Sequence, residues 1–358
     1  MRIIVDGTPI PYHEGDSLLI ALLRAEMPPT AGGCLCLAGD CGHCLATVDG
    51  VSYVRTCQTA AQPGQMVARD HAHGRPPLPQ TMQHGAAVPT RHEFCDVVVI
   101  GQGEAGRTAA EQARAAGHTV ITLEAEQGEE AIGLYMGPLV IARTAAGLRH
   151  IHPAHEIIVA TGAAEIQPVA PGNELAGIVT ARAAEKLARA GLQLGRLVAI
   201  GTPPQGVAAE QVAGELVRFE GQEGRVTAVV VRGEDGRETT HPCDTVSVGL
   251  GLNPRNNLWR MGRGLPIPMQ IVGDAALEGD IPPCPVAGII CTCSNVTVEQ
   301  LQSVWERGFH ELELVKRATL AGTGTCQGAM CIPHLRSFLA DRGQVLQPLS
   351  PPALSVAN

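Results

Sequence analysis

Residues 95–106 read CDVVVIGQGEAG, an apolar run that leads straight into a glycine-rich turn. The run from Val97 to Ile100 predicts a buried strand, because it is apolar on both faces. An alanine-rich stretch, Ala105 to Ala116, predicts a helix, and Thr119 to Leu123 predicts the next strand. This strand–helix–strand order predicts an α/β core with a mostly parallel sheet.

The G-x-G-x-x-G turn is a candidate dinucleotide site. It lies between strand and helix, where backbone N–H groups and the helix dipole bind a pyrophosphate. Glu124 closes the second strand 18 residues after Gly106, where a carboxylate can bind a ribose hydroxyl. The candidate residues are Gly101, Gly103, Glu104, Ala105, Gly106 and Glu124. A packing turn without a ligand is the alternative, and Glu104 favours it, because a carboxylate beside a phosphate is unfavourable unless it points away.

Two groups of four cysteines flank this core. The first has the spacing C-x4-C-x2-C-x12-C and the second has the spacing C-x-C-x32-C-x4-C. Four thiolates suit iron-sulfur clusters, which carry single electrons. The candidate ligands are Cys36, Cys41, Cys44 and Cys57 in the first group and Cys291, Cys293, Cys326 and Cys331 in the second. At the first group, a structural zinc site and exchange of Cys34 for Cys36 are the alternatives.

A proline-rich segment divides the chain. Before it, short apolar strands, a helix over Ser17 to Glu26 and a hairpin around Asp49-Gly50 predict a small β-rich domain. The segment itself, from His71 to Pro89, has few apolar residues and predicts a linker. The predicted boundaries are residues 1–72 for the N-terminal cysteine domain, 73–94 for the linker, 95–283 for the nucleotide-binding domain, 284–342 for the C-terminal cysteine domain and 343–358 for a flexible tail.

The overall composition argues against several partners. The 358 residues carry a formal net charge of -9 without a block rich in lysine and arginine, which argues against nucleic acid as a partner. No apolar stretch reaches the roughly 20 residues of a transmembrane helix, and Asp6 interrupts the first apolar run before a secretory signal forms. We expect a cytoplasmic protein, with peripheral attachment to the inner membrane through its complex as the alternative. In that compartment the 12 cysteines favour ligands over disulfides.

The cysteine segments resemble known families. CLAGDCGHCLATVDGVSYVRTC, residues 36–57, is similar to the plant-type 2Fe-2S domains found as small subunits of bacterial hydrogen cyanide synthase and related amine dehydrogenases. IICTCSNVTVEQL, residues 289–301, and LVKRATLAGTGTCQGAMC, residues 314–331, resemble the bacterioferritin-associated-ferredoxin-like domain of the large subunits of cyanide synthase, opine oxidase and D-hydroxyproline dehydrogenase. The resemblance implies that the eight candidate cysteines hold two 2Fe-2S clusters.

The resemblance also implies the architecture of the whole chain. It implies an N-terminal β-grasp ferredoxin domain, a compact, truncated Rossmann core like that of FAD/NAD-linked reductases, and a small helical C-terminal domain. Ala160-Thr161-Gly162 and Gly273-Asp274 resemble the later FAD contacts of the two-dinucleotide-domain disulfide reductases. By that resemblance Thr161, Gly162, Gly273 and Asp274 bind FAD, with Asp274 on the ribityl chain. An additional FMN at a subunit interface is a further implied cofactor.

A second glycine turn, Gly201 to Gly206, lies where those reductases bind NAD(P)H. Pro203 and Pro204 within it lack the N–H groups that a phosphate would need, so we expect no NAD(P)H there. The sequence also shows no convincing general base or nucleophile, and we name no catalytic residue.

These features predict the electron-transfer subunit of a heteromeric flavin-dependent amine or amino-acid dehydrogenase, of the glycine, proline-derivative, opine or sarcosine type. A FAD-dependent, oxidase-like subunit is the expected catalytic partner. Electrons would pass from flavin through the two clusters to a quinone, cytochrome or dye. The alternatives are a self-contained NAD(P)H:acceptor reductase, and a non-catalytic iron-sulfur assembly or sensor protein whose core holds ATP or no nucleotide.

Overall fold

The computed structural model describes residues 1–69 and 87–344, and these form two compact units. Unit 1 combines residues 1–69, 165–251 and 280–344, and unit 2 combines residues 87–164 and 252–279. Most of the predicted linker, and all but two residues of the predicted tail, lie outside the described residues. Residues 95–283, predicted as one domain, contribute to both units.

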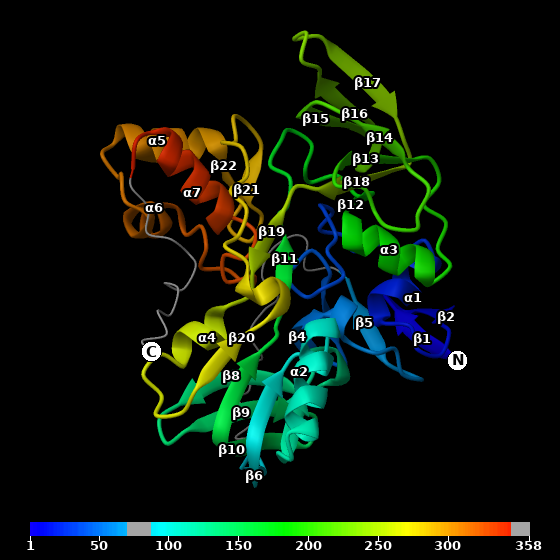
Figure 1. Cartoon of the computed structure of the whole chain (residues 1–358). Coiled ribbons are helices and arrows are strands. Elements are labelled where there is room, and N and C mark those ends of the chain that lie inside the picture. The colour runs from blue at the N-terminus through cyan, green and yellow to red at the C-terminus, as the bar shows by residue number, and fades with distance from the viewer. Residues whose placement is uncertain (70–86, 345–358) are drawn as a thin grey trace. The chain divides into compact units, whose positions relative to one another are not determined.

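Unit 2 contains the predicted strand–helix–strand order (Figure 1). Its elements are β6 (Thr90–Ile100), α2 (Glu104–Ala115), β7 (Val120–Leu123), β8 (Glu130–Tyr135), β9 (Leu139–Thr144), β10 (Gly147–Val159), β19 (Leu252–Pro254), α4 (Asn257–Met261) and β20 (Met269–Ile271). The sheet order is β7-β6-β10-β9-β8, with β20 also on β10. The strands β7, β6, β10 and β20 are parallel, which confirms the predicted parallel core.

The apolar run of β6 fills both faces of this sheet. Val97 and Val99 pack with Ala110 of α2, whereas Val98 and Ile100 pack into the opposite core with Val159. Because side chains alternate along a strand, a continuous apolar run is what a strand covered on both faces requires. The strand begins at Thr90, before this run, because residues 90–95 pair with residues 148–153 of β10.

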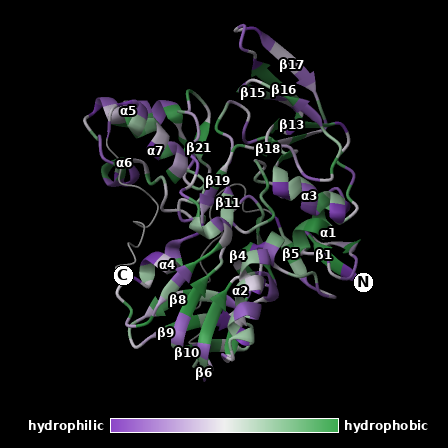
Figure 2. Ribbon diagram, viewed as in Figure 1, coloured by the Kyte–Doolittle hydropathy of each residue, from purple (hydrophilic) through white to green (hydrophobic). Residues whose placement is uncertain are grey.

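The N-terminal part of unit 1 is a β-grasp fold, as predicted. Its elements are β1 (Arg2–Val5), β2 (Thr8–Pro11), α1 (Leu18–Arg24), β3 (Leu45–Val48), β4 (Val51–Arg55) and β5 (Met66–Ala68), with the sheet order β2-β1-β5-β3-β4. Ser17 caps α1 by accepting a hydrogen bond from the Ile20 amide. The helix is strongly apolar (Figure 2), and Leu18 and Leu22 pack on the sheet core.

Residues 165–251, here called the middle lobe, form a second small Rossmann-like layer. The chain enters it through β11 (Ala163–Glu165). Its elements are β12 (Ile178–Thr180), α3 (Ala181–Arg189), β13 (Leu197–Gly201), β14 (Glu210–Val212), β15 (Glu215–Gln222), β16 (Arg225–Arg232), β17 (Glu238–Pro242) and β18 (Thr245–Gly249). The parallel sheet has the order β12-β18-β13-β14, and β15, β16 and β17 form an antiparallel sheet.

The second glycine turn of the middle lobe lacks the helix that a dinucleotide site needs. The described residues between β13 and β14, 202–209, form turns, and the chain then continues as a strand. A pyrophosphate binds at a helix N-terminus, where several N–H groups point outward. Residues 202–209 contain no helix N-terminus, and the absence of NAD(P)H from this turn stays a prediction.

The C-terminal part of unit 1 is a small, mainly helical domain, as predicted. Its elements are β21 (Ile289–Cys291), β22 (Val296–Thr297), α5 (Val298–Glu306), α6 (Leu312–Thr319) and α7 (Ile332–Asp341). Thr297 and Gln300 form a capping box that begins α5. Phe338 is completely buried among Leu301, Leu335 and their neighbours.

Both cysteine domains dock on the middle lobe through hydrogen bonds to their own backbone groups. Leu35 of the N-terminal domain pairs with the edge of β12. Its amide donates to Ile178 O at 2.9 Å, and its carbonyl accepts from the Thr180 amide at 3.0 Å. On the other domain, the Asn173 side chain donates to Ile289 O at 2.7 Å, and the Ile289 amide donates back to Asn173 Oδ1 at 3.3 Å. The middle lobe therefore holds both cysteine domains within one compact unit.

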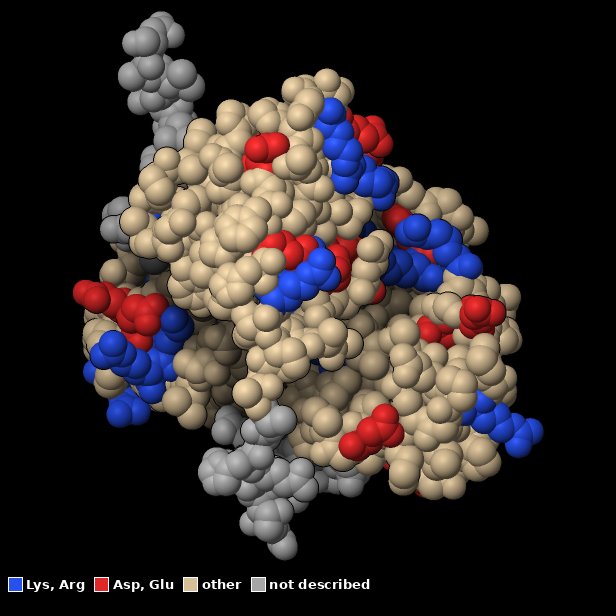
Figure 3. Space-filling view, turned by 90° about the horizontal axis from the view of Figure 1, so that it is seen from below, with Lys and Arg blue, Asp and Glu red and all other residues tan. Residues whose placement is uncertain are grey.

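Charged side chains are mixed on the surface. On the face drawn in Figure 3, acidic and basic groups lie side by side rather than in one broad basic area. Several of them are paired, such as Arg218 with Glu220 and Glu238. Within residues 1–69 and 87–344, no helix is long and apolar enough to cross a membrane.

Phe338→Ala should destabilise the C-terminal domain by about 3–5 kcal/mol, because it leaves a large cavity in a fully buried core. Urea unfolding followed by circular dichroism measures the loss. Leu314→Ala on α6 is the control, since this side chain is 39% exposed and should change stability by less than about 0.5 kcal/mol. Equal effects of the two substitutions would contradict the described core.

Candidate functional site

The N-terminal cysteine loop is tightly wound around its thiols. Cys36 Sγ accepts hydrogen bonds from the amides of Ala38 and Cys41, both at 3.4 Å. A side chain at Gly33 would come within 2.3 Å of the His43 ring, and the φ of +83° at Gly33 also favours glycine. Amide donors around sulfur and close backbone approach are what a loop around an iron-sulfur cluster needs.

The four thiols of this loop come together in two contacting pairs. A hydrogen bond from Cys41 lowers the pKa of Cys36, and the same contact raises the pKa of Cys41. A hydrogen bond from Cys57 is the main cause that lowers the pKa of Cys44 to about 7, and the nearby charge of Arg55 also lowers it. Iron is bound by thiolates, so all four thiols would release their protons on binding a cluster.

Cys34 lies apart from this group. It packs in the apolar core of the middle lobe with Ile178 and Val198, and burial raises its pKa well above the ordinary value. Cys36 instead packs with Cys41. The geometry therefore supports Cys36 as the ligand, although the assignment stays a prediction.

The C-terminal thiols form a connected group. Cys293 Sγ lies 3.5 Å from Cys326 Sγ, and Cys291 hydrogen-bonds to both Cys293 and Cys331. Hydrogen bonds from Cys291 and Cys326 lower the pKa of Cys293, the first being the stronger cause. Backbone amides of Gly322, Gly328 and Met330 also donate to these sulfurs. Four sulfurs with backbone donors fit one cluster held by four cysteines.

The two cysteine sites touch each other inside unit 1. Cys36 and Cys41 of the first site pack in one cluster with Cys326 and Met330, and Cys293 lies against it. A side chain at Gly42 would lie 3.4 Å from Thr325 Oγ1, so the two loops run close together there. Sequence analysis predicted both sites but had no signal for this contact.

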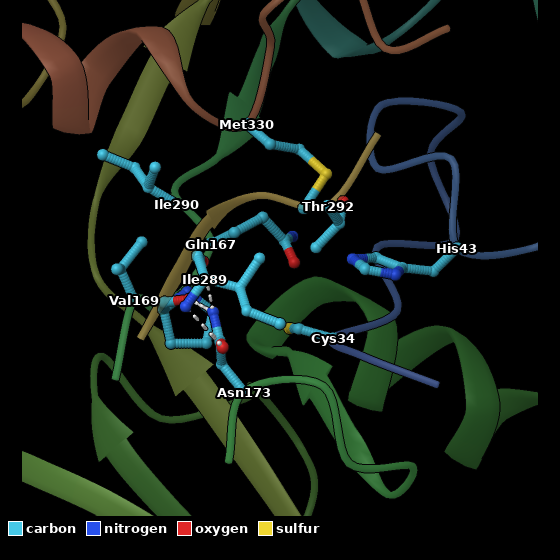
Figure 4. Close-up of a pocket in the computed structure, with 10 residues that line it drawn as sticks. Cys34, His43, Gln167, Val169, Asn173, Ile289, Ile290, Thr292 and Met330 are labelled. Atoms are coloured by element: carbon cyan, nitrogen blue, oxygen red, sulfur yellow. Dashed lines mark hydrogen bonds between the residues drawn. The ribbon is translucent and has the colours of Figure 1, made fainter. Parts of the chain in front are cut away.

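A small buried cavity lies beside this contact (Figure 4). Its volume is about 10 Å³, enough for about one water molecule. The amide of Gln167 points into it on the side of His43, and neither amide atom has a hydrogen-bond partner among the described residues. Burial lowers the pKa of His43 to about 4, so the ring is neutral near pH 7. A bound water here would satisfy the Gln167 amide.

In unit 2, the glycine turn has the shape of a dinucleotide loop. A side chain at Gly101 would lie 2.2 Å from Ala160 O, and one at Gly106 would lie 2.0 Å from Gly101 O. At Gly103, which caps α2, a side chain would meet nothing within 4 Å, so this side of the loop is open. In a dinucleotide loop the first glycine permits a tight turn, the second lets the pyrophosphate approach, and the third permits close packing of the helix.

Glu124 fixes this loop in place. Its Oε2 accepts a hydrogen bond from the Gln102 amide at 2.6 Å, and its Oε1 accepts one from the Glu126 amide at 3.2 Å. Glu104 is exposed in the first turn of α2. The Glu124 carboxylate therefore holds the glycine turn in place, and its binding to a ribose stays a prediction.

The other two predicted FAD segments converge on the same turn. Ala160, which precedes Thr161 and Gly162, lies against Gly101 and Gly106. A side chain at Gly273 would come within 2.8 Å of the Ala105 Cβ, which places Asp274 near the start of α2. Arg255 Nη1 donates to Thr161 O at 3.2 Å, a contact that sequence analysis did not anticipate. The residues present thus fit a dinucleotide, although their roles stay predictions.

Comparisons with known proteins agree with the two cysteine sites and the fold. Residues 1–72 match the model of a 2Fe-2S iron-sulfur cluster binding domain, and residues 289–341 match a BFD-like [2Fe-2S] binding domain. The chain carries two 2Fe-2S domains. This confirms the predicted 2Fe-2S domains at both ends.

The fold is similar to that of L-proline dehydrogenase from P. horikoshii, with a TM-score of 0.74 and 17% identity over 100% of this chain and 97% of that chain. Thioredoxin reductase from T. acidophilum matches with a TM-score of 0.40 and 15% identity, over 70% of this chain and 99% of that chain. A search of curated proteins found no significant match. The similarity to the proline dehydrogenase confirms the predicted reductase-like architecture.

Cys36→Ser should remove the N-terminal cluster, whereas Cys34→Ser should keep it, because only Cys36 lies among the other thiols. Iron analysis of the anaerobically purified chain should show half the iron in the first variant and the full amount in the second. Electron paramagnetic resonance identifies which cluster is lost. The opposite pattern would make Cys34 the ligand.

Gly103→Val should lower the flavin content by about tenfold or more, because the new side chain fills the open side of the loop. Iron content should stay unchanged, since the cysteine sites are in unit 1. Gln102→Ala in the same turn is the control and should retain flavin. Normal flavin in Gly103→Val would show that this loop does not hold the cofactor.

Proposed function

We propose that this chain is the electron-transfer subunit of a heteromeric, flavin-dependent amine or amino-acid dehydrogenase. The observation that carries the proposal is the contact between the two cysteine sites, where Cys36 and Cys41 pack with Cys326. Two one-electron sites side by side suit a chain that delivers electrons singly to an acceptor. An assembly protein has no need for two such sites in contact.

The nucleotide loop of unit 2 supports FAD as the second cofactor. When bound, FAD would supply exchange between two-electron and one-electron chemistry. The amides of Gly101 to Gly106 and the dipole of α2 would hold its pyrophosphate. Glu124 would keep this loop in position, and Asp274 would lie near the start of α2. An additional FMN would require residues from a partner subunit.

The residues of this chain would bind the cofactors and stabilise their charge, and would not themselves react with the substrate. Backbone amides around Cys36, Cys293 and Cys326 stabilise negative charge on sulfur, which favours electron uptake at both sites. The buried side chains of the contact include Met330, which packs with Cys36, Cys41 and Cys326. With no catalytic base identified, removal of hydrogen from a C–N bond would fall to the partner, a FAD-dependent oxidase-like subunit.

The structure does not favour the rival function of a self-contained NAD(P)H reductase. Its nicotinamide site would have to be the second glycine turn, which has two prolines and no following helix in residues 202–209. The name of the similar structure, L-proline dehydrogenase, makes proline and its derivatives the first donors to test, followed by glycine, opines and sarcosine. A quinone, a cytochrome or a dye would be the electron acceptor.

Anaerobic affinity purification of the tagged chain from its native host should recover a stoichiometric flavoprotein partner, identified by mass spectrometry. The complex should reduce a dye with an amine or amino acid, and the chain alone should not. Purification with the Cys36→Ser variant is the control: the partner should still bind, but dye reduction should fall. Recovery of the chain alone, with its clusters rapidly bleached by NADH, would overturn the proposal.

A further inference from the structure

Arg55 extends from one cysteine site to the other. It ends β4, two residues before Cys57, and its Nη2 donates a hydrogen bond to Thr325 O at 2.9 Å. Thr325 directly precedes Cys326. The two residues are 270 positions apart in the chain, so the bond joins the N-terminal and C-terminal cysteine domains.

The rest of the Arg55 guanidinium faces the N-terminal site. Its charge acts on Cys44, and its Nε is buried without a hydrogen-bond partner among the described residues. A buried donor without an acceptor is costly, and more so when it carries charge. Beside four thiolates and their iron, an anionic sulfur would be the natural acceptor, and the planar guanidinium can donate in two directions at once.

Thr325 completes the link on the other side. Its hydroxyl lies 3.7 Å from Cys293 Sγ, and its carbonyl accepts the hydrogen bond from Arg55 of the N-terminal domain. One residue of the C-terminal site therefore touches both the cation and a ligand sulfur.

From these contacts we infer that Arg55 is a positioning residue shared by the two cysteine sites. It fixes the Thr325–Cys326 loop against the N-terminal domain, and its charge stabilises the extra negative charge that reduction brings to either site. The inference rests on the proposed function, because it presumes that both sites hold clusters. The inference adds to that function one residue that affects the midpoint potentials of both clusters and the interaction between them.

The test is a potentiometric titration of the full chain, followed by electron paramagnetic resonance. In Arg55→Gln, the midpoint potentials of both clusters should shift to more negative values, because the reduced forms lose a nearby cation. The magnetic interaction between the two reduced clusters should also weaken as the loops separate. Arg55→Lys should restore part of both potentials, because it keeps the charge but loses the two-directional donor.

Two control variants separate this role from general effects. Arg69→Gln removes a cation of the same domain whose hydrogen bonds go to Asp6 and Pro28, and should shift neither potential. Thr325→Val removes the hydroxyl near Cys293 and should lower only the potential of the C-terminal cluster. If Arg55→Gln loses iron, loss from both sites with recovery in Arg55→Lys supports the inference, and loss from one site contradicts it.

The outcomes also distinguish this inference from the proposed function. A shift confined to the N-terminal cluster, or no shift with full iron content, would overturn the shared role of Arg55 and leave the electron-transfer function standing. A wild-type chain that binds no iron-sulfur cluster at all would overturn both.

Discussion

The backbone pairing of Leu35 with β12 is the interaction on which the arrangement of unit 1 depends. Two main-chain hydrogen bonds, to Ile178 O and from the Thr180 amide, place the first cysteine loop against the middle lobe. Lys186 of α3 adds a bond to Leu37 O at 3.1 Å, and Arg24 reaches Ala190 O at 2.9 Å. An open strand edge is otherwise exposed to unwanted pairing, and here the loop covers it.

The middle lobe keeps the parallel sheet of a dinucleotide fold but not the helix after its glycine turn. The parallel strands β12, β18 and β13 remain, but the turn after Gly201 leads into β14 instead of a helix. The surfaces of the lobe now serve other parts of the chain, through Asn173 at the C-terminal domain and α3 at the N-terminal domain. Its main contribution is therefore to hold two redox domains in contact.

The sequence allowed the local elements and the ligand groups to be predicted, because each has a short-range signal. The glycine turn after Ile100, the capping residues and the cysteine spacings are read within a few positions of one another. The early start of β6 at Thr90 was missed, since its polar residues form a strand only by pairing with β10. The bond from Arg55 to Thr325 was missed for the same reason: its partner lies 270 residues away, and no local pattern indicates it.

The long separation between contacting segments has a consequence for the order of synthesis. Leu37 and Lys186 lie 149 residues apart, and Arg55 and Thr325 lie 270 residues apart. A chain made from its N-terminus completes the first cysteine loop long before the surface that will cover it, and domains generally fold as units during synthesis. During that interval the loop is open to water and to whatever delivers iron and sulfide. Metal delivery to the first site can therefore precede docking, whereas the second site cannot be completed before Cys331 has been synthesised.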